Sequence, residues 1–318
     1  MSDQTGIDYL DAAWSPIHGC LPGLPCWGHC WARRMAHRLY AAGVRGYERE
    51  FAPTFDPHRL AQPLHWKKPR RIGVNFMGDT WAKGITDEQI AAVFGVMAGC
   101  PQHVFVLTTK QAARMEQWFE KVGKPNASNR AVPRCLSAAQ RLIGGREGDA
   151  IWKRDIDVTA WPLPNLWLGV SVMTQQDADE RIPHLLRCPA TVHWVSIEPM
   201  WEGIDLRHIK PWHPDHGPDG ADALGGGSWG HRFLPRPGYC NHSNSPRLDW
   251  VVCGAESGPK ARPMDIAWAR SLRDQCDKDH GNVRFYYKQG PGDAGEPFKH
   301  PRLDGKVWDQ LPDKELAA

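Results

Sequence analysis

Short apolar runs alternate with amphipathic stretches along most of the chain, and this alternation predicts its secondary structure. The apolar runs have the length and composition of buried strands, and the predicted strands are 8–17, 72–76, 104–108, 166–172, 192–197, 250–254 and 283–287. Between most of them, apolar residues recur at helical spacing, and the predicted helices are 28–42, 86–98, 110–121, 175–187 and 265–279. Thr86 and Gln89 fit a capping box at the start of one helix.

Strands that alternate with helices indicate a parallel sheet, because each parallel connection is long and is usually a helix. The apolar runs are nearly continuous, as in strands of a covered sheet. We therefore expect an α/β fold with a partial or closed (β/α) barrel, and a doubly wound open sheet is the alternative. We expect a single barrel domain over 1–318, with irregular insertions at about 122–164 and 207–248 and a polar, loosely packed C-terminal tail.

Composition limits the function classes without choosing one. The net charge is +3, from 39 basic and 36 acidic residues, which permits nucleic-acid binding but does not require it. The chain has no apolar run long enough to span a membrane and no secretory signal at its start. Nine cysteines, an odd number and mostly scattered, favour a reducing compartment over a disulfide framework, so we expect a cytoplasmic protein.

Three of the cysteines lie close together, in the stretch that begins at Gly19 and ends at Ala32. Cys20, Cys26 and Cys30 have the spacing C-x5-C-x3-C. Thiols this close in sequence typically bind a metal, bind an iron–sulfur cluster or form a disulfide. A structural zinc site has four ligands, whereas a [4Fe–4S] cluster held by three cysteines leaves one iron open to another ligand.

Polar residues follow nearly every predicted strand. In a (β/α) barrel the chemistry gathers at the carboxyl ends of the strands, and these ends carry Gly78, Asp79, Lys110, Ser171, Glu198, Glu256, Lys288 and Gln289. Any one of them alone reads as a helix cap, but together they predict a shared site. Glu198, which precedes Pro199, is the strongest single candidate, and Asp79 is next.

Seven motifs in order resemble a known family. They are Gly19-Cys20…Cys26…Cys30-Trp31-Ala32, the basic stretch 66–72, Leu107-Thr108-Thr109-Lys110, Trp167-Leu168-Gly169-Val170-Ser171-Val172, Ser196-Ile197-Glu198-Pro199, Gly254-Ala255-Glu256-Ser257-Gly258-Pro259 and Tyr287-Lys288-Gln289. Over about residues 8–204 and 249–310 the chain resembles the phage Gp37/Gp68 family (three-cysteine-motif, DUF5131), which looks like a branch of the radical S-adenosylmethionine (SAM) enzymes.

The resemblance implies a partial barrel of the radical-SAM type and an enzyme that cleaves SAM to a 5′-deoxyadenosyl radical, which abstracts hydrogen from a substrate. It implies that Cys20, Cys26 and Cys30 hold a [4Fe–4S] cluster, that SAM binds the open iron and that a reductant protein supplies electrons. The cofactor-binding positions that it implies are Gly78, Asp79, Lys110, Ser171, Glu198 and Glu256. The chain departs from the usual radical-SAM spacing C-x3-C-x2-C. Trp27 and His29 are therefore only offset candidates for the aromatic residue that normally precedes the third cysteine.

Two questions stay open at this point. The first is the metal, because His18 or His29 could complete a Cys3His zinc site in a barrel that binds nucleic acid or a protein partner without radical chemistry. The second is the substrate. The phage context of the resembling family and the basic residues Lys67, Lys68, Arg70 and Arg71 favour a nucleic-acid base as the substrate of modification or repair, with a peptide or a small metabolite as the alternative.

Overall fold

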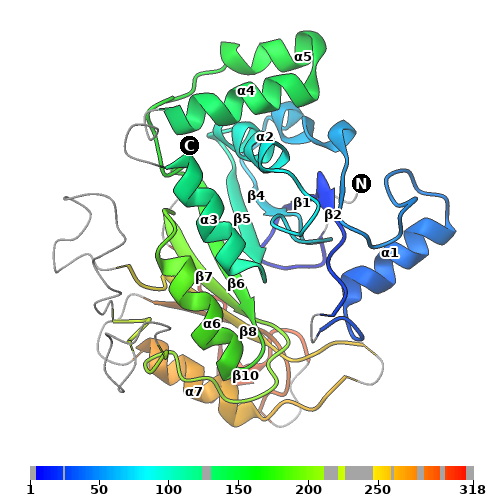
Figure 1. Ribbon diagram of the computed structural model, residues 1–318. Helices are drawn as coiled ribbons and strands as arrows, with labels where there is room; N and C mark the ends of the chain where they lie inside the picture. The colour runs from blue at the N-terminus through cyan, green and yellow to red at the C-terminus, as the bar shows by residue number, and fades with distance from the viewer. Residues whose placement is uncertain are drawn as a thin grey trace. The chain divides into compact units, whose positions relative to one another are not determined.

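The computed structural model describes residues 5–23, 26–123, 130–210, 221–225, 246–258, 261–277, 283–293 and 298–312. Where the sequence predicts one domain, the chain divides into two compact units, Met1–Trp167 with Glu315–Ala318, and Leu168–Lys314. The boundary between them falls within a strand, β6 (Leu166–Val172). Figure 1 shows the helices and strands of both units.

The strands of the main sheet follow one another in the hydrogen-bonded order β1-β4-β5-β6-β7-β8-β9. The pairings β1–β4, β4–β5, β7–β8 and β8–β9 are parallel. A doubly wound sheet reverses its strand order at a switch point, and this order never reverses. The fold is therefore the α/β class that the sequence predicts, with the consecutive order of a barrel-like sheet, and the doubly wound alternative is wrong.

The first unit contains the elements β1 (Ala12–Trp14), β2 (Ile17–His18), α1 (Trp31–Ala41), β3 (Thr54–Phe55), β4 (Arg71–Val74), α2 (Asp87–Ala98), β5 (Val104–Thr109), α3 (Ala112–Val122), α4 (Ala131–Ile143) and α5 (Gly145–Ala150). It also has short 3-10 turns at Pro57–Arg59, Gln62–His65 and Ile151–Lys153. The predicted capping box is present at α2: Gln89 N donates to Thr86 Oγ1 and Thr86 N donates to Gln89 Oε1.

The segment 122–164 is not the irregular insertion that the sequence predicts, because it contains α4 and α5. Gly95 of α2 lets α4 approach closely: a Cβ atom there would lie 2.1 Å from the carbonyl oxygen of Cys135. Pro133 argues against a helix in the sequence. In the structure it lies in the first turn of α4, where a backbone N–H has no intrahelical partner, so the lack of one at proline costs nothing. Helix α4 therefore belongs to the core of the first unit.

The second unit contains most of β6 and then α6 (Gln175–Leu186), β7 (Val192–Ile197), β8 (Trp250–Gly254), α7 (Ile266–Asp277), β9 (Arg284–Gln289) and the hairpin β10 (Arg302–Leu303) and β11 (Lys306–Val307). The described part of the tail packs on the sheet, contrary to prediction. Trp250 Nε1 donates to the Gln310 carbonyl at 2.9 Å, and Tyr287 N donates to the Trp308 carbonyl at 2.7 Å.

The predicted insertion 207–248 lies mostly outside the described residues. Its described ends are tied together by an antiparallel bridge between Ile209 and Ala221 and by a hydrogen bond from Leu248 N to the Ala223 carbonyl at 2.8 Å. Ala223 and Leu248 are fully buried. Across the described residues, no helix has the length and apolar character needed to cross a membrane.

Candidate functional site

The cysteine loop of the first unit is fixed by its backbone. The predicted first strand, 8–17, divides into β1 and β2, and the loop leaves β2. Gly19 forms a parallel bridge with Gly78, in the turn that follows β4. Gly19 N donates to the Met77 carbonyl at 3.0 Å, and Asp79 N donates to the Gly19 carbonyl at 3.1 Å. The loop therefore starts at the carboxyl end of β4, as expected for a site on a parallel sheet.

Two glycines make this close approach possible. Gly19 has φ +82°, and a Cβ there would lie 2.2 Å from the Ala52 carbonyl oxygen. A Cβ on Gly78 would lie 2.5 Å from the carbonyl oxygen of Gly19. The motif match marked Gly78 as a cofactor contact, whereas the structure gives it a second role: it makes room for the loop.

The three cysteines form no disulfide and are partly buried. Cys20 and Cys30 pack against the same hydrophobic cluster, formed by Ala32, Ala36, Tyr47 and Phe51. Burial, and then the charge of Asp79, raise the pKa of the Cys20 thiol to about 12. Cys20 is therefore protonated at neutral pH, and a metal that binds it must displace the proton.

The three thiols share a loop, and two of them, Cys20 and Cys30, share the hydrophobic cluster. Within the described ranges, no three His, Cys, Asp or Glu side chains form a group that could hold one metal ion. Residues 24–25, inside the loop, lie outside those ranges. Thiols are the donors that iron–sulfur clusters and zinc prefer, so the residue types of the loop fit such a group.

Asp79 links the ends of β4 and β5 beside the loop. It is 4% exposed, and its carboxylate accepts three hydrogen bonds: from Thr109 Oγ1 at 2.6 Å, from Trp81 N at 3.0 Å and from Lys110 N at 2.9 Å. These bonds fix the position of the carboxylate, whose negative charge raises the pKa of Cys20. Sequence reasoning placed Asp79 and Lys110 in this site but missed the hydrogen bonds between them.

In the second unit, the carboxyl ends of β7, β8 and β9 form their own polar cluster. Glu198 Oε1 lies 3.1 Å from Lys288 Nζ in an ion pair, and Ser196 Oγ donates to Glu198 Oε2 at 3.4 Å. A Cβ on Gly254 would lie 3.0 Å from Glu198 Oε1. Glycine at the end of β8 therefore leaves space for the Glu198 carboxylate. The peptide bond between Glu198 and Pro199 is cis.

Glu256 has partners that sequence reasoning did not find. Arg262 N donates to Glu256 Oε2 at 3.1 Å, and the Arg262 guanidinium lies 3.9 Å from the centroid of the Trp201 ring. Arg262 and Trp201 come from two different loops, so no periodic pattern marks them as neighbours. Ser171 is buried, and its carbonyl accepts a hydrogen bond from Arg181 at 2.7 Å.

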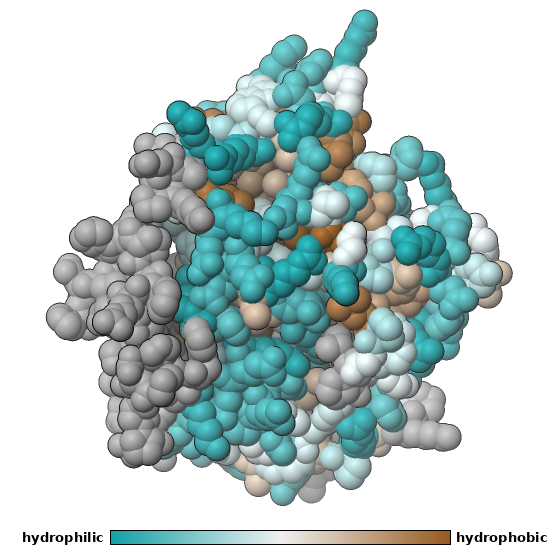
Figure 2. All heavy atoms as spheres, viewed as in Figure 1, coloured by the Kyte–Doolittle hydropathy of each residue, from teal (hydrophilic) through white to brown (hydrophobic). Residues whose placement is uncertain are grey.

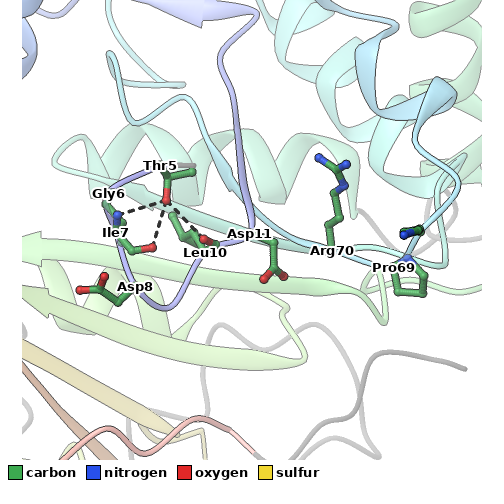
Figure 3. A pocket seen from close by; sticks show the side chains of 9 residues that line it. Thr5, Gly6, Ile7, Asp8, Leu10, Asp11, Pro69 and Arg70 are labelled. Atoms are coloured by element: carbon green, nitrogen blue, oxygen red, sulfur yellow. Dashed lines mark hydrogen bonds between the residues drawn. The ribbon is translucent and has the colours of Figure 1, made fainter. Parts of the chain in front are cut away.

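The basic run Lys67, Lys68, Arg70 and Arg71 lies at the amino end of β4, whereas the cysteine loop contacts the carboxyl end. A pocket of about 620 Å³ opens there, and Figure 3 shows the residues that line it: Thr5, Gly6, Ile7, Asp8, Leu10, Asp11, Lys68, Pro69 and Arg70. Asp8 and Asp11 offset the basic charge, and Arg71 N donates to Asp11 Oδ2 at 2.7 Å. This run is poorly placed to bring an anionic substrate to the cysteines.

The fold and the site together define an α/β protein with consecutive parallel strands. A loop with three cysteines that form no disulfide lies at the carboxyl end of β4. The chain belongs to the family described as "Protein of unknown function (DUF5131)", which matches residues 4–312. No curated protein matches the chain, and no solved structure matches it.

The Glu198–Lys288 pair gives a direct test of the second cluster. Lys288→Met should lower the free energy of unfolding by about 3 kcal/mol, because it leaves the Glu198 carboxylate buried and unpaired. Glu198→Gln combined with Lys288→Met should recover most of that loss, as measured by urea denaturation. Lys121→Met, whose partner Asp87 is exposed, is the control and should cost less than about 1 kcal/mol. If the losses of unfolding free energy from the two single substitutions simply add in the double variant, Glu198 and Lys288 do not stabilise each other.

Proposed function

We propose that the protein is an iron–sulfur enzyme of the radical-SAM type, with a cluster held by Cys20, Cys26 and Cys30. The observation that carries the proposal is the loop of three cysteines without a disulfide, anchored through the Gly19–Gly78 bridge at the carboxyl end of β4. Parallel α/β folds place their chemistry at this end. The hydrophobic cluster under Cys20 and Cys30 would shield a bound group from water.

The residues around Cys20 suit SAM as well as a cluster. A [4Fe–4S] cluster on three thiolates would offer one open iron to SAM and the electron that cleaves it to a 5′-deoxyadenosyl radical, which abstracts hydrogen from a substrate. The negative charge of Asp79 raises the pKa of Cys20, and the positive charge of Lys110 lowers it. The amino-acid end of SAM also carries both charges, so this pair matches it.

The polar cluster of the second unit, which includes Ser171, Glu198 and Glu256, offers ligand-binding groups of its own. Glu198 Oε1 is buried and lies 3.1 Å from Lys288 Nζ. A carboxylate oxygen can accept more than one hydrogen bond. A ligand hydroxyl or ammonium group would therefore bind beside Lys288. An outside reductant would have to supply the electrons.

A second candidate, a Cys3His zinc site, is favoured by one observation at His18. This side chain is 1% exposed, its Nε2 atom contacts the Gly46 carbonyl, and its Nδ1 atom has no hydrogen-bond partner among the described residues. Histidines that bind metals typically donate their second ring N–H to a backbone carbonyl in this way. The other histidine candidate, His29, is exposed.

Metal content after anaerobic reconstitution separates the two candidates. The proposed enzyme should take up about four irons and four sulfides per chain, turn brown and bind SAM in titration calorimetry only when the cluster is present. A colourless protein that holds one zinc and takes up no iron would reject the enzyme. His18→Gln should then release the zinc, whereas a three-cysteine cluster should survive that substitution.

A further inference from the structure

Helix α1 begins immediately after Cys30 and presents a mixed face to solvent. Trp31, Arg34, Met35 and Arg38 are exposed, and their spacing of three, four and seven residues puts them on one side of the helix. The other side carries Ala32 and Ala36, which are buried in the hydrophobic cluster beneath the cysteines. One helix therefore connects the cysteine loop to an outer surface (Figure 1).

This helix exposes three large apolar side chains. Trp31 is 49% exposed, Met35 39% and Tyr40 49%. They are three of the six exposed large hydrophobic side chains among the residues that the structure describes. Figure 2 shows hydrophilic and hydrophobic residues intermixed over this edge of the first unit. Trp31 and Met35 are four residues apart and share a side of the helix, whereas Tyr40 lies on another side. Exposed apolar side chains placed together on a surface can mark a binding site.

The charge on the helix defines the ligand. Helix α1 carries Arg33, Arg34 and Arg38 and no Asp or Glu. The whole stretch 26–50 has five arginines against two glutamates. The Arg33 guanidinium already lies 5.0 Å from the ring centroid of Trp27, so arginine and tryptophan also meet beside the loop. A ligand that complements this face has regularly spaced negative charge and flat apolar groups.

We propose that the face formed by Trp31, Arg34, Met35 and Arg38 binds single-stranded nucleic acid. Exposed aromatic rings stack on bases and arginines contact phosphates, which is how proteins hold single strands without reading their sequence. The face starts one residue after Cys30, so a bound strand passes beside the cysteine loop. The inference deepens the proposed function by naming its substrate class, and it moves the nucleic-acid surface from the basic run 67–71 to α1.

The test uses protein as isolated, without reconstitution, and a fluorescein-labelled 20-nucleotide DNA of mixed sequence. Binding is measured by anisotropy from 50 to 200 mM salt. Trp31→Ala should weaken binding by about 10-fold, because one stacked base is lost. Arg34→Gln with Arg38→Gln should reduce the slope of log K against log salt by about 1.4, the value for two lost phosphate contacts on a single strand.

Two matched controls remove the same kinds of side chain from positions outside helix α1. Trp152→Ala removes another exposed tryptophan, which is 41% exposed, and Lys67→Gln with Lys68→Gln removes the same charge from the basic run. Both should bind like the parent protein, and the duplex of the same sequence should bind more weakly than the single strand.

Three results would overturn the proposal: no binding at 50 mM salt, equal losses in the control variants, or equally tight binding of a polyglutamate peptide of the same charge. The last result would indicate an acidic protein as the partner. Iron uptake is measured on separate samples, so a failure of the cluster and a failure of this surface are distinguishable.

Discussion

Replacing any one of Cys20, Cys26 or Cys30 by alanine is expected to abolish the iron–sulfur absorbance of the reconstituted protein. A cluster on three thiolates has no spare cysteine ligand in the loop, so each substitution leaves only two. We expect bound iron to fall from about four atoms per chain to near zero in each variant. Iron, sulfide and visible absorbance are measured on anaerobic samples.

Cys100→Ala is the matched control. Cys100 is fully buried, burial raises the pKa of its thiol to about 12, and it lies outside the loop. We expect it to keep the full iron content, even if the cavity that it leaves lowers stability by about 1 kcal/mol. Far-ultraviolet circular dichroism of each variant shows whether lost iron reflects a lost ligand or a lost fold. Iron retained by any of the three loop variants would refute the ligand assignment.

The regular elements of this fold were predictable because each carries a local signal. Helix α2 has its capping box and its apolar period in the sequence, and it begins where they place it. The strands β6, β7 and β8 are continuous apolar runs and were found at almost the same residues. The consecutive strand order agrees with the tendency of strands that follow one another in the sequence to lie side by side in a sheet.

The sequence failed where tertiary contacts decide the structure. Helix α4 has an apolar period, but Pro133 and the polar residues on both sides favoured an irregular segment. Its stability comes from packing against Gly95, which no local pattern reports. The tail to residue 312 is polar and reads as loose, yet its backbone hydrogen-bonds to residues of β8 and β9.

Some parts of the candidate site were also predictable from the sequence, whereas others depend on tertiary contacts. The cysteine loop, Asp79 and Glu198 were predictable because they follow strands, and strand ends mark the active edge of a parallel sheet. Lys288 was in the predicted set, but its ion pair with Glu198 depends on the spacing of β7 and β9 around Gly254. The basic run precedes β4, so the sequence already indicated that it lies at the amino end of this strand. Only its charge suggested a role at the site.

Gly78→Ala is expected to displace the cysteine loop. The added Cβ would lie 2.5 Å from the Gly19 carbonyl oxygen and 2.6 Å from the Gly19 nitrogen, and these are backbone atoms that cannot rotate away. Crowding of this kind typically costs about 1–3 kcal/mol. We therefore expect a loss of unfolding free energy in that range and a reconstituted iron content well below that of the parent protein.

Gly28→Ala provides the control within the loop itself, because a Cβ there has no atom within 4 Å. It should change the unfolding free energy by less than about 0.5 kcal/mol and leave iron uptake intact. Urea denaturation of the apo proteins measures the first quantity, and iron analysis after reconstitution measures the second. If Gly78→Ala lowers stability but keeps all its iron, the cluster does not depend on the bridge between Gly19 and Gly78. The loop would then hold its metal without support from β4.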